Sequence, residues 1–232
     1  NDGVSASVEG GSFGSFGAQG RVQTAFETGK WTHAYSVSGG YKRSDGGTDN
    51  SDFEKGQGYG NLSFSYDQRF DIIAQLGIAT QSYGANTFYS AKYNNQYEKT
   101  DHGLASLNLS LHNQEKTWEI APQFYYNKFK DHYQLIRGMA GAKAGENYHD
   151  LDVYGGGLNA NVAWALGKTA VGFDISKECI YSTALGEELA EKDYKDISGS
   201  DRQYTRKGER TNTNIMLEHN FIFGGFTLSA GV

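Results

Sequence analysis

Hydrophobic and polar residues alternate with a period of two along most of the chain. In the segment 118–126 the odd positions are Glu119, Ala121, Gln123 and Tyr125, and the even ones are Trp118, Ile120, Pro122, Phe124 and Tyr126. The segments 106–112 and 154–164 repeat the pattern, with leucines at positions 107, 109 and 111 opposite Asn108 and Ser110. Because successive side chains of a β-strand point to opposite faces, the alternation predicts strands with one apolar and one polar face.

The pattern predicts an all-β protein with about eleven antiparallel strands. Several of them are longer than the five or six residues of a typical soluble strand. A strand tilted across a lipid bilayer needs roughly 9–11 residues, and most of the predicted strands reach this length. The predicted strands cover residues 3–11, 16–27, 32–43, 57–67, 70–82, 101–112, 117–130, 151–165, 168–182, 209–222 and 226–232.

The connections between these segments alternate between tight and long. Tight turns fall near residues 28–30, 67–69, 113–116, 166–167 and 223–225, and the long polar stretches are 44–56, 83–100, 131–150 and 183–208. Short turns at one rim and long loops at the other are typical of an outer-membrane barrel. A soluble antiparallel sheet with one wet face is the alternative, but it gives no reason for this segregation of loop lengths.

Aromatic residues stand at the ends of the apolar faces, as at Trp118 and Tyr126 or at Tyr154 and Trp164. Trp and Tyr occupy the two interfaces of a bilayer, where the ring contacts lipid and the polar tip contacts water. The opposite faces are rich in Asn, Ser, Gln and Gly, which suits a wet lumen and not a dry core. We therefore predict a transmembrane antiparallel β-barrel.

Composition and charge agree with this fold class and exclude others. The 232 residues include 31 Gly and 1 Pro, and Gly costs about 1 kcal/mol per helical position relative to Ala. The net charge of −6 and pI near 5.5 argue against a nucleic-acid partner. One Cys excludes a disulfide framework and a cysteine zinc cluster. The mean hydropathy is −0.62, and barrel strands carry only a weak hydropathy signal.

Several strings of residues, in their order and spacing, resemble a TonB-dependent outer-membrane receptor of the vitamin or siderophore type, as found in Bacteroidetes. They are VSASVEGGSFG at 4–14, YKRSDG at 41–46, NSDF at 50–53, GANTFY at 84–89 and YNNQYE at 93–98. The resemblance implies a barrel of 22 strands closed around an N-terminal plug. Residues 1–232 then correspond to the first half of the barrel, with the plug domain and the C-terminal half absent.

The same resemblance implies a place and partners. The expected location is the outer membrane of a Gram-negative cell, crossed many times. The expected partners are the TonB–ExbB–ExbD complex, acting through the missing N-terminal region, outer-membrane lipid and a surface lipoprotein. No enzymatic activity is expected. The Gly-x-Ser-x-Gly string at 10–14 lacks the strand–turn–helix setting that a nucleophile elbow needs.

Two loops are candidates for ligand binding. Rigid aromatic rings interleaved with amides suit a bulky, ring-rich ligand, and the candidate residues are Tyr83, Asn86, Phe88, Tyr89, Tyr93 and Tyr97. Carboxylates at short spacing are candidate calcium ligands, although they do not match an EF-hand loop, and these are Asp45, Asp49 and Asp52. The six His residues show no zinc-ligand spacing, and His102, His132 and His149 lie near loop bases.

The predicted function is TonB-dependent import of a scarce bulky nutrient, with cobalamin ranked ahead of a ferric siderophore. The ranking depends on the acidic and aromatic loops, which resemble those of cobalamin receptors. Two alternatives stay open. One is a lidded SusC-like importer of oligosaccharide or peptide, and the other is a passive porin or an adhesion barrel.

Overall fold

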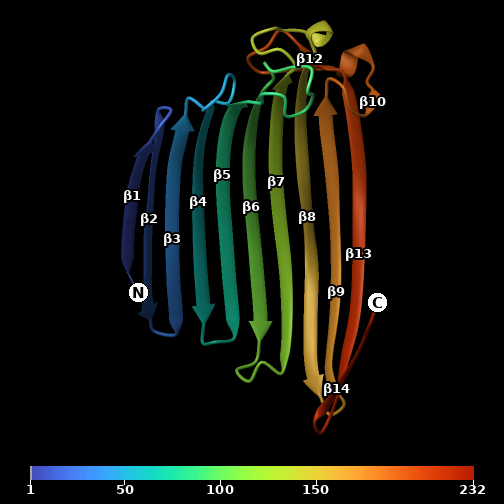
Figure 1. Ribbon diagram of the computed structural model, residues 1–232. Coiled ribbons are helices and arrows are strands. Elements are labelled where there is room, and N and C mark those ends of the chain that lie inside the picture. The colour runs from blue at the N-terminus through green and yellow to red at the C-terminus, as the bar shows by residue number, and fades with distance from the viewer. Residues whose placement is uncertain (1) are drawn as a thin grey trace.

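The computed structural model describes residues 2–232 and forms one long, twisted antiparallel sheet (Figure 1). Its long strands follow the chain in order, each hydrogen-bonded to the next. They are β1 (Gly3–Gly11), β2 (Ser15–Thr28), β3 (Trp31–Ser44), β4 (Phe53–Tyr66), β5 (Phe70–Gly84), β6 (Tyr97–His112), β7 (Trp118–Gln134), β8 (Glu146–Trp164), β9 (Gly167–Ser182), β13 (Arg206–Phe223) and β14 (Phe226–Gly231). These elements correspond one to one with the eleven predicted strands, so the predicted fold class is confirmed.

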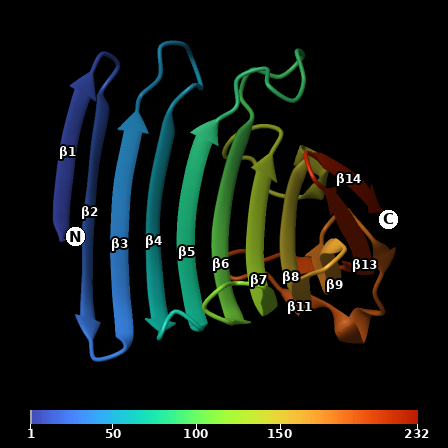
Figure 2. The same cartoon turned by 90° about the horizontal axis from the view of Figure 1, so that it is seen from below.

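The sheet curves but stays open. Within residues 2–232, β1 pairs only with β2, and β14 pairs only with the lower part of β13. The view from below shows the resulting arc, with β1 and β14 at its two ends (Figure 2). An open edge inside a bilayer leaves backbone groups without partners, at several kcal/mol for each unsatisfied group. This geometry therefore corresponds to part of a barrel wall.

Short turns and long loops lie at opposite rims, as the sequence predicts. Four long loops share one rim, at residues 45–52, 85–96, 135–145 and 183–205. These loops are shorter than expected because the strands continue into them, notably β7 to Gln134 and β8 from Glu146. Charged side chains beyond the apolar band are solvated by water, so the strands can stay hydrogen-bonded past the edge of the bilayer.

The last long loop contains small elements that the alternation does not predict. They are β10 (Glu187–Glu188), which pairs with β13, the ribbon of β11 (Lys195–Asp196) and β12 (Gln203–Tyr204), and the 3₁₀ helix η2 (Glu191–Asp193). A second 3₁₀ helix, η1 (Ala142–Ala144), lies in the loop before β8. The stretch 187–196 therefore contains two short strands with one turn of 3₁₀ helix between them.

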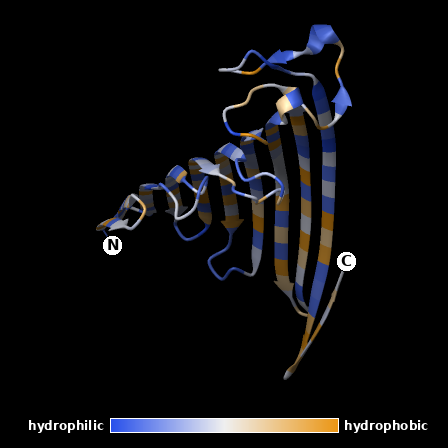
Figure 3. Cartoon of the chain, turned by 45° about the horizontal axis from the view of Figure 1, so that its top comes forward, coloured by the Kyte–Doolittle hydropathy of each residue, from blue (hydrophilic) through white to orange (hydrophobic). Residues whose placement is uncertain are grey.

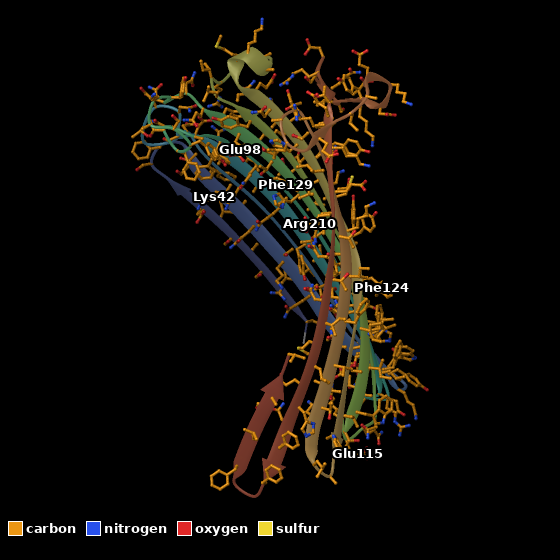
Figure 4. The ribbon with its side chains drawn as sticks, turned by 90° about the vertical axis from the view of Figure 1, so that its right-hand side faces the viewer. Lys42, Glu98, Glu115, Phe124, Phe129 and Arg210 are labelled. Carbon is orange, nitrogen blue, oxygen red and sulfur yellow. The ribbon has the colours of Figure 1, made fainter. Side chains whose placement is uncertain are left out.

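The register places the alternating apolar residues on the convex face. Leu107 pairs with Ala74 on one side and Phe124 on the other, whereas Asn108 pairs with Ile73 and Gln123. Directly paired residues of an antiparallel sheet share a face. Figure 4 shows the division within one strand, because Phe124 and Phe129 of β7 project from opposite sides. The hydropathy colouring shows the same alternation along the strands (Figure 3).

The sheet has almost no dry core. Among the described residues only Ala85, Ile197 and Tyr204 are buried hydrophobic side chains, and all three lie at the long-loop rim. On the convex face Leu76 is 63% exposed and Ile78 is 71% exposed. A contiguous apolar surface of this extent marks an interface with another apolar phase. Residues 118–126 of β7, from Trp to Tyr, span nine positions, which matches one crossing of a tilted strand.

Aromatic pairs border the apolar band at the short-turn rim. The Trp31 and Tyr66 rings lie 4.9 Å apart, and Trp164 donates its indole N–H to the Thr169 hydroxyl at 2.9 Å. His33 and His219 also belong to this border, since His33 stacks on Phe26 at 4.8 Å.

The concave face is polar and internally hydrogen-bonded. Gln75 donates to the Tyr59 hydroxyl at 2.6 Å and accepts from Ser106 at 3.1 Å. Tyr125 of β7 reaches over β8 to Asp174 of β9 at 3.2 Å, and Gly155 permits this because its Cβ would lie 2.6 Å from the Tyr125 hydroxyl. A hollow of about 1240 Å³ lies on this face between β1 and β8.

Candidate functional site

Three long loops join into one structure above the concave face, which we call the loop cap (residues 45–52, 85–96 and 135–145). The Asn50 amide donates to the carbonyl oxygens of Asn94 at 3.1 Å and Gln96 at 2.6 Å. The first two loops also meet at Gly84, where a Cβ would lie 2.6 Å from the Asn50 backbone. This glycine permits the close approach, so the loops form a single surface.

Arg137 ties the third loop to the first. Its guanidinium donates to both carboxylate oxygens of Asp52, at 2.6 and 2.9 Å, and to the Asn50 side chain at 3.2 Å. It also lies over the Tyr97 ring at 4.9 Å. The hydrogen bonds from Arg137 lower the pKa of Asp52, so this carboxylate is charged at neutral pH. The bidentate geometry fixes the loops more firmly than a single charge contact does.

Gln96 forms the polar centre of the loop cap. It is fully buried, and its amide donates to the carbonyl oxygens of Ser90 and Tyr93 at 3.0 and 2.7 Å. Its own oxygen accepts from the Tyr133 hydroxyl at 3.0 Å. A buried amide with all these groups satisfied specifies one loop conformation, because any other conformation leaves polar atoms without partners.

An aromatic strip, formed by Tyr83, Phe88, Tyr89 and Tyr133, borders the cap. The Phe88 and Tyr89 rings meet edge to face at 4.8 Å, and Tyr89 meets Tyr133 at 5.3 Å. The Tyr83 and Tyr89 hydroxyls both donate to Glu98, and they lie 3.2 Å from each other. Burial, followed by the contact with Glu98, raises the pKa of Tyr83 to about 12 and also raises the pKa of Tyr89.

The strip combines fixed rings with accessible surface. Phe88 is 75% exposed and Tyr89 is 50% exposed, and a hollow of about 340 Å³ lies between Phe88 and the first loop at Thr48 and Ser51. Rings held in place by neighbours bind a flat or ring-rich molecule at low entropic cost.

The structure divides the predicted ligand-contact residues. Tyr83, Phe88 and Tyr89 come together in the strip. Asn86 instead holds the loops together, since its side chain donates to the Asp49 carbonyl at 2.8 Å. Tyr93 is 39% exposed on the same loop.

Tyr97 stands apart from the strip. It pairs with Gln134 and Gly84 on the convex parity, and the Arg137 guanidinium covers its ring. The alternation within β6 could have shown this, because Tyr97 shares parity with Leu107 and not with Glu98.

The predicted calcium ligands do not converge. Arg137 engages Asp52, and Arg43 engages Asp45 at 2.8 Å. Within residues 2–232 no group of three or more His, Cys, Asp or Glu side chains is arranged to hold a metal ion. The calcium site predicted from Asp45, Asp49 and Asp52 therefore gains no support from the geometry.

A second polar cluster anchors the third loop at Glu146. Its carboxylate accepts from His132 and Tyr148 at 2.9 Å each and from the Gly141 backbone N–H at 2.7 Å. Burial opposes ionisation, but these hydrogen bonds outweigh it and lower the pKa of Glu146 to about 2. His132 also stacks on Tyr148 at 4.1 Å, so this histidine serves the loop and not the concave face.

The convex face above the apolar band carries interleaved charges. Lys128 bonds Asp150 and, at 2.8 Å, Asp152, while Lys177 bonds Glu209 at 3.1 Å. Cys179 lies within this belt and pairs with Asp152 and Glu209. Charged neighbours surround this thiol because the strand has already left the apolar band.

Sequence reasoning missed Glu98, Asp131, Tyr133 and Arg137, the residues that complete the site. The first three fell inside stretches assigned to loops, whereas they lie on β6 and β7 with the parity of the concave face. Extending the alternation past Lys128 could have found them. No local signal identifies Arg137, because its partners are 85 and 87 residues away.

No helix in the described residues is long and apolar enough to cross a membrane. No protein-family model and no curated protein matches the chain. Among solved structures, the chain is similar to "Copper transporter OprC", with a TM-score of 0.71 and 16% identity. The match covers all of this chain and 36% of that one, so the chain spans about a third of the length of the transporter. At this identity the likeness shows a shared fold.

Proposed function

We propose that this chain is part of the barrel wall of an outer-membrane importer that is driven by the TonB system and takes up a scarce, bulky nutrient. The ligand binds at the loop cap and passes along the polar concave face. The chain's own residues bind and orient the ligand, and no covalent chemistry is involved.

The division of the sheet into an apolar convex face and a polar concave face carries this proposal. The convex face has exposed leucines, isoleucines and aromatics, and the concave face is lined by hydrogen-bonded polar groups. A soluble sheet would have to cover the apolar face, whereas lipid covers it directly. The shared fold with a transporter supports the same conclusion.

The ligand we propose is a corrinoid or an iron chelate, with cobalamin first. The strip of Phe88, Tyr89 and Tyr133 supports a ring-rich ligand of this size. The contact between Arg137 and Asp52, one of the candidate calcium ligands, can itself hold the loop that favoured cobalamin in the sequence. Binding of cobalamin is therefore expected to be independent of calcium.

The test is a titration of the complete receptor in detergent with cyanocobalamin and with a ferric siderophore, each with and without a calcium chelator. Tight binding of one ligand, weakened by Phe88→Ala together with Tyr89→Ala, supports the proposal. Val37→Ala, on the convex face, is the matched control and should leave binding unchanged. A receptor that binds neither ligand, and that conducts small solutes passively in planar bilayers, contradicts active import.

A further inference from the structure

Two carboxylic side chains meet on the concave face directly beneath the aromatic strip. Glu98 of β6 and Asp131 of β7 lie on the same face, two residue pairs apart in the register, so they are diagonal neighbours across the two strands. Two neighbouring carboxylates disfavour each other's ionisation unless a proton or a cation lies near them. Burial, followed by the charge of Glu98, raises the pKa of Asp131 to about 7.

The pair lacks a basic counter-charge. Sixteen ion pairs occur among residues 2–232, and none joins Glu98 or Asp131 to a Lys or an Arg. Other acids of the concave face do have a basic partner, as Glu178 has in Arg210 at 2.7 Å and Glu9 has in Lys42 at 2.6 Å. The basic side chain that faces Asp131 is His149, whose Nε2 lies 4.0 Å from the carboxylate. Burial lowers the pKa of His149. His149 is therefore neutral at physiological pH.

Two buried oxygen atoms at this place have no partner. They are the Thr100 hydroxyl and one oxygen of Asp131. Thr100 is 4% exposed and pairs directly with Asp131 across the two strands, so the side chains stand next to each other on the concave face. Leaving a buried hydroxyl without a partner is unfavourable, so the unpartnered Thr100 hydroxyl is informative.

We infer that the pair formed by Glu98 and Asp131 receives a protonated amine of the imported ligand, which the carboxylates and the Thr100 hydroxyl bind while the aromatic strip stacks on its ring system. The inference rests on the proposed function and narrows its substrate class to ligands with a positively charged organic group. It disfavours anionic iron chelates, which the uncompensated acidic pair would repel.

An ammonium group fits this site better than a metal ion. Within the described residues no third carboxylate or imidazole is arranged with these two to complete a metal-ligand set. The surrounding groups are the hydroxyls of Tyr83, Tyr89 and Tyr133, whose oxygens can accept hydrogen bonds, and the exposed ring of Phe88, whose face attracts an organic cation.

The experiment measures binding to the complete receptor by calorimetry with two matched pairs of probes. One pair is ferrioxamine B, which has a free ammonium, and its N-acetylated form. The other is cyanocobalamin and an aminoalkyl conjugate of it. Charge-assisted hydrogen bonds predict roughly ten- to hundredfold tighter binding of the cationic member in at least one pair. Glu98→Gln and Asp131→Asn should each abolish this preference.

Glu178→Gln is the matched control, because it removes a carboxylate of the same face that Arg210 already neutralises, and it should keep the preference. Migration of unheated and heated samples in detergent gels confirms that each variant is folded. Equal binding of both members in both pairs, or binding of none of the four probes, overturns the inference. So does calcium binding by the receptor that both substitutions at the acidic pair abolish. If neutral cyanocobalamin or neutral N-acetyl ferrioxamine is imported and neither pair shows a preference for its cationic member, the proposed function stands while this inference fails.

Discussion

A charge placed at the centre of the convex face should destabilise the protein far more than the same charge one residue away. Leu109 faces outward, and the register that pairs Asn108 with Gln123 and Leu111 with Ile120 places it opposite Pro122. Position 122 is midway between the aromatic borders at 118 and 126. Leu109→Arg thus introduces a guanidinium at the bilayer midplane.

The expected penalty follows from this depth. Arg at the midplane of a barrel costs about 2–4 kcal/mol, and the cost falls to about 0–1 kcal/mol near an interface. A cost of about 2–4 kcal/mol corresponds to a decrease of roughly 30- to 1,000-fold in the folding equilibrium constant. Leu111→Arg should cost less than Leu109→Arg, because Leu111 pairs with Phe70 at the border of the band. Asn108→Arg should cost least, since its side chain enters the wet concave face.

The assay is equilibrium unfolding of the complete protein in lipid vesicles, followed by tryptophan fluorescence across a urea series. The order of cost should be position 109, then 111, then 108. Nitroxide labels at 108 and 109 provide an independent readout, because oxygen should reach the label at 109 and a polar relaxation agent the label at 108. Equal costs for the three substitutions, or equal accessibility of the two labels, would refute the assignment of faces.

The remaining predictions concern closure, the concave face and the loops. Residues 1–232 expressed alone should give no heat-modifiable barrel in detergent gels, because both edges of the sheet stay open; an SDS-resistant compact species would contradict this. Gly155→Val should lower the yield of folded protein, whereas Gly60→Val should not, since only the former Cβ meets the Tyr125 hydroxyl. Arg137→Ala should increase hydrogen exchange throughout the loop cap, and unchanged exchange would exclude Arg137 as its anchor. Because the pKa of Glu146 is about 2 in the folded protein, its contribution to loop stability should be present above about pH 4.5 and lost toward pH 2. Glu146→Gln should remove that pH dependence in the same exchange measurement.

The sequence alone determined the strands, their order and their two faces. Each of these depends on local information, because the alternation of side chains within a strand is set by backbone geometry. The placement of the short turns and the long loops follows from the same segmentation, although the long loops are shorter than predicted. The opposite orientations of Leu109 and Asn108 were therefore predictable without knowledge of any neighbouring strand.

The tertiary structure decided the site. Contacts such as that of Arg137 with Asp52 join residues 85 positions apart, and no local pattern encodes them. In the structure a guanidinium from a distant loop contacts Asp52, one of the three candidate calcium ligands Asp45, Asp49 and Asp52. The separation of Tyr97 from Tyr83, by contrast, was available from the sequence, because the alternation of β6 continues to Tyr97 and gives it the parity of Leu107. The acidic pair of Glu98 and Asp131 depends on the register between β6 and β7. The local sequence of either strand does not show which residues of the other strand lie beside it.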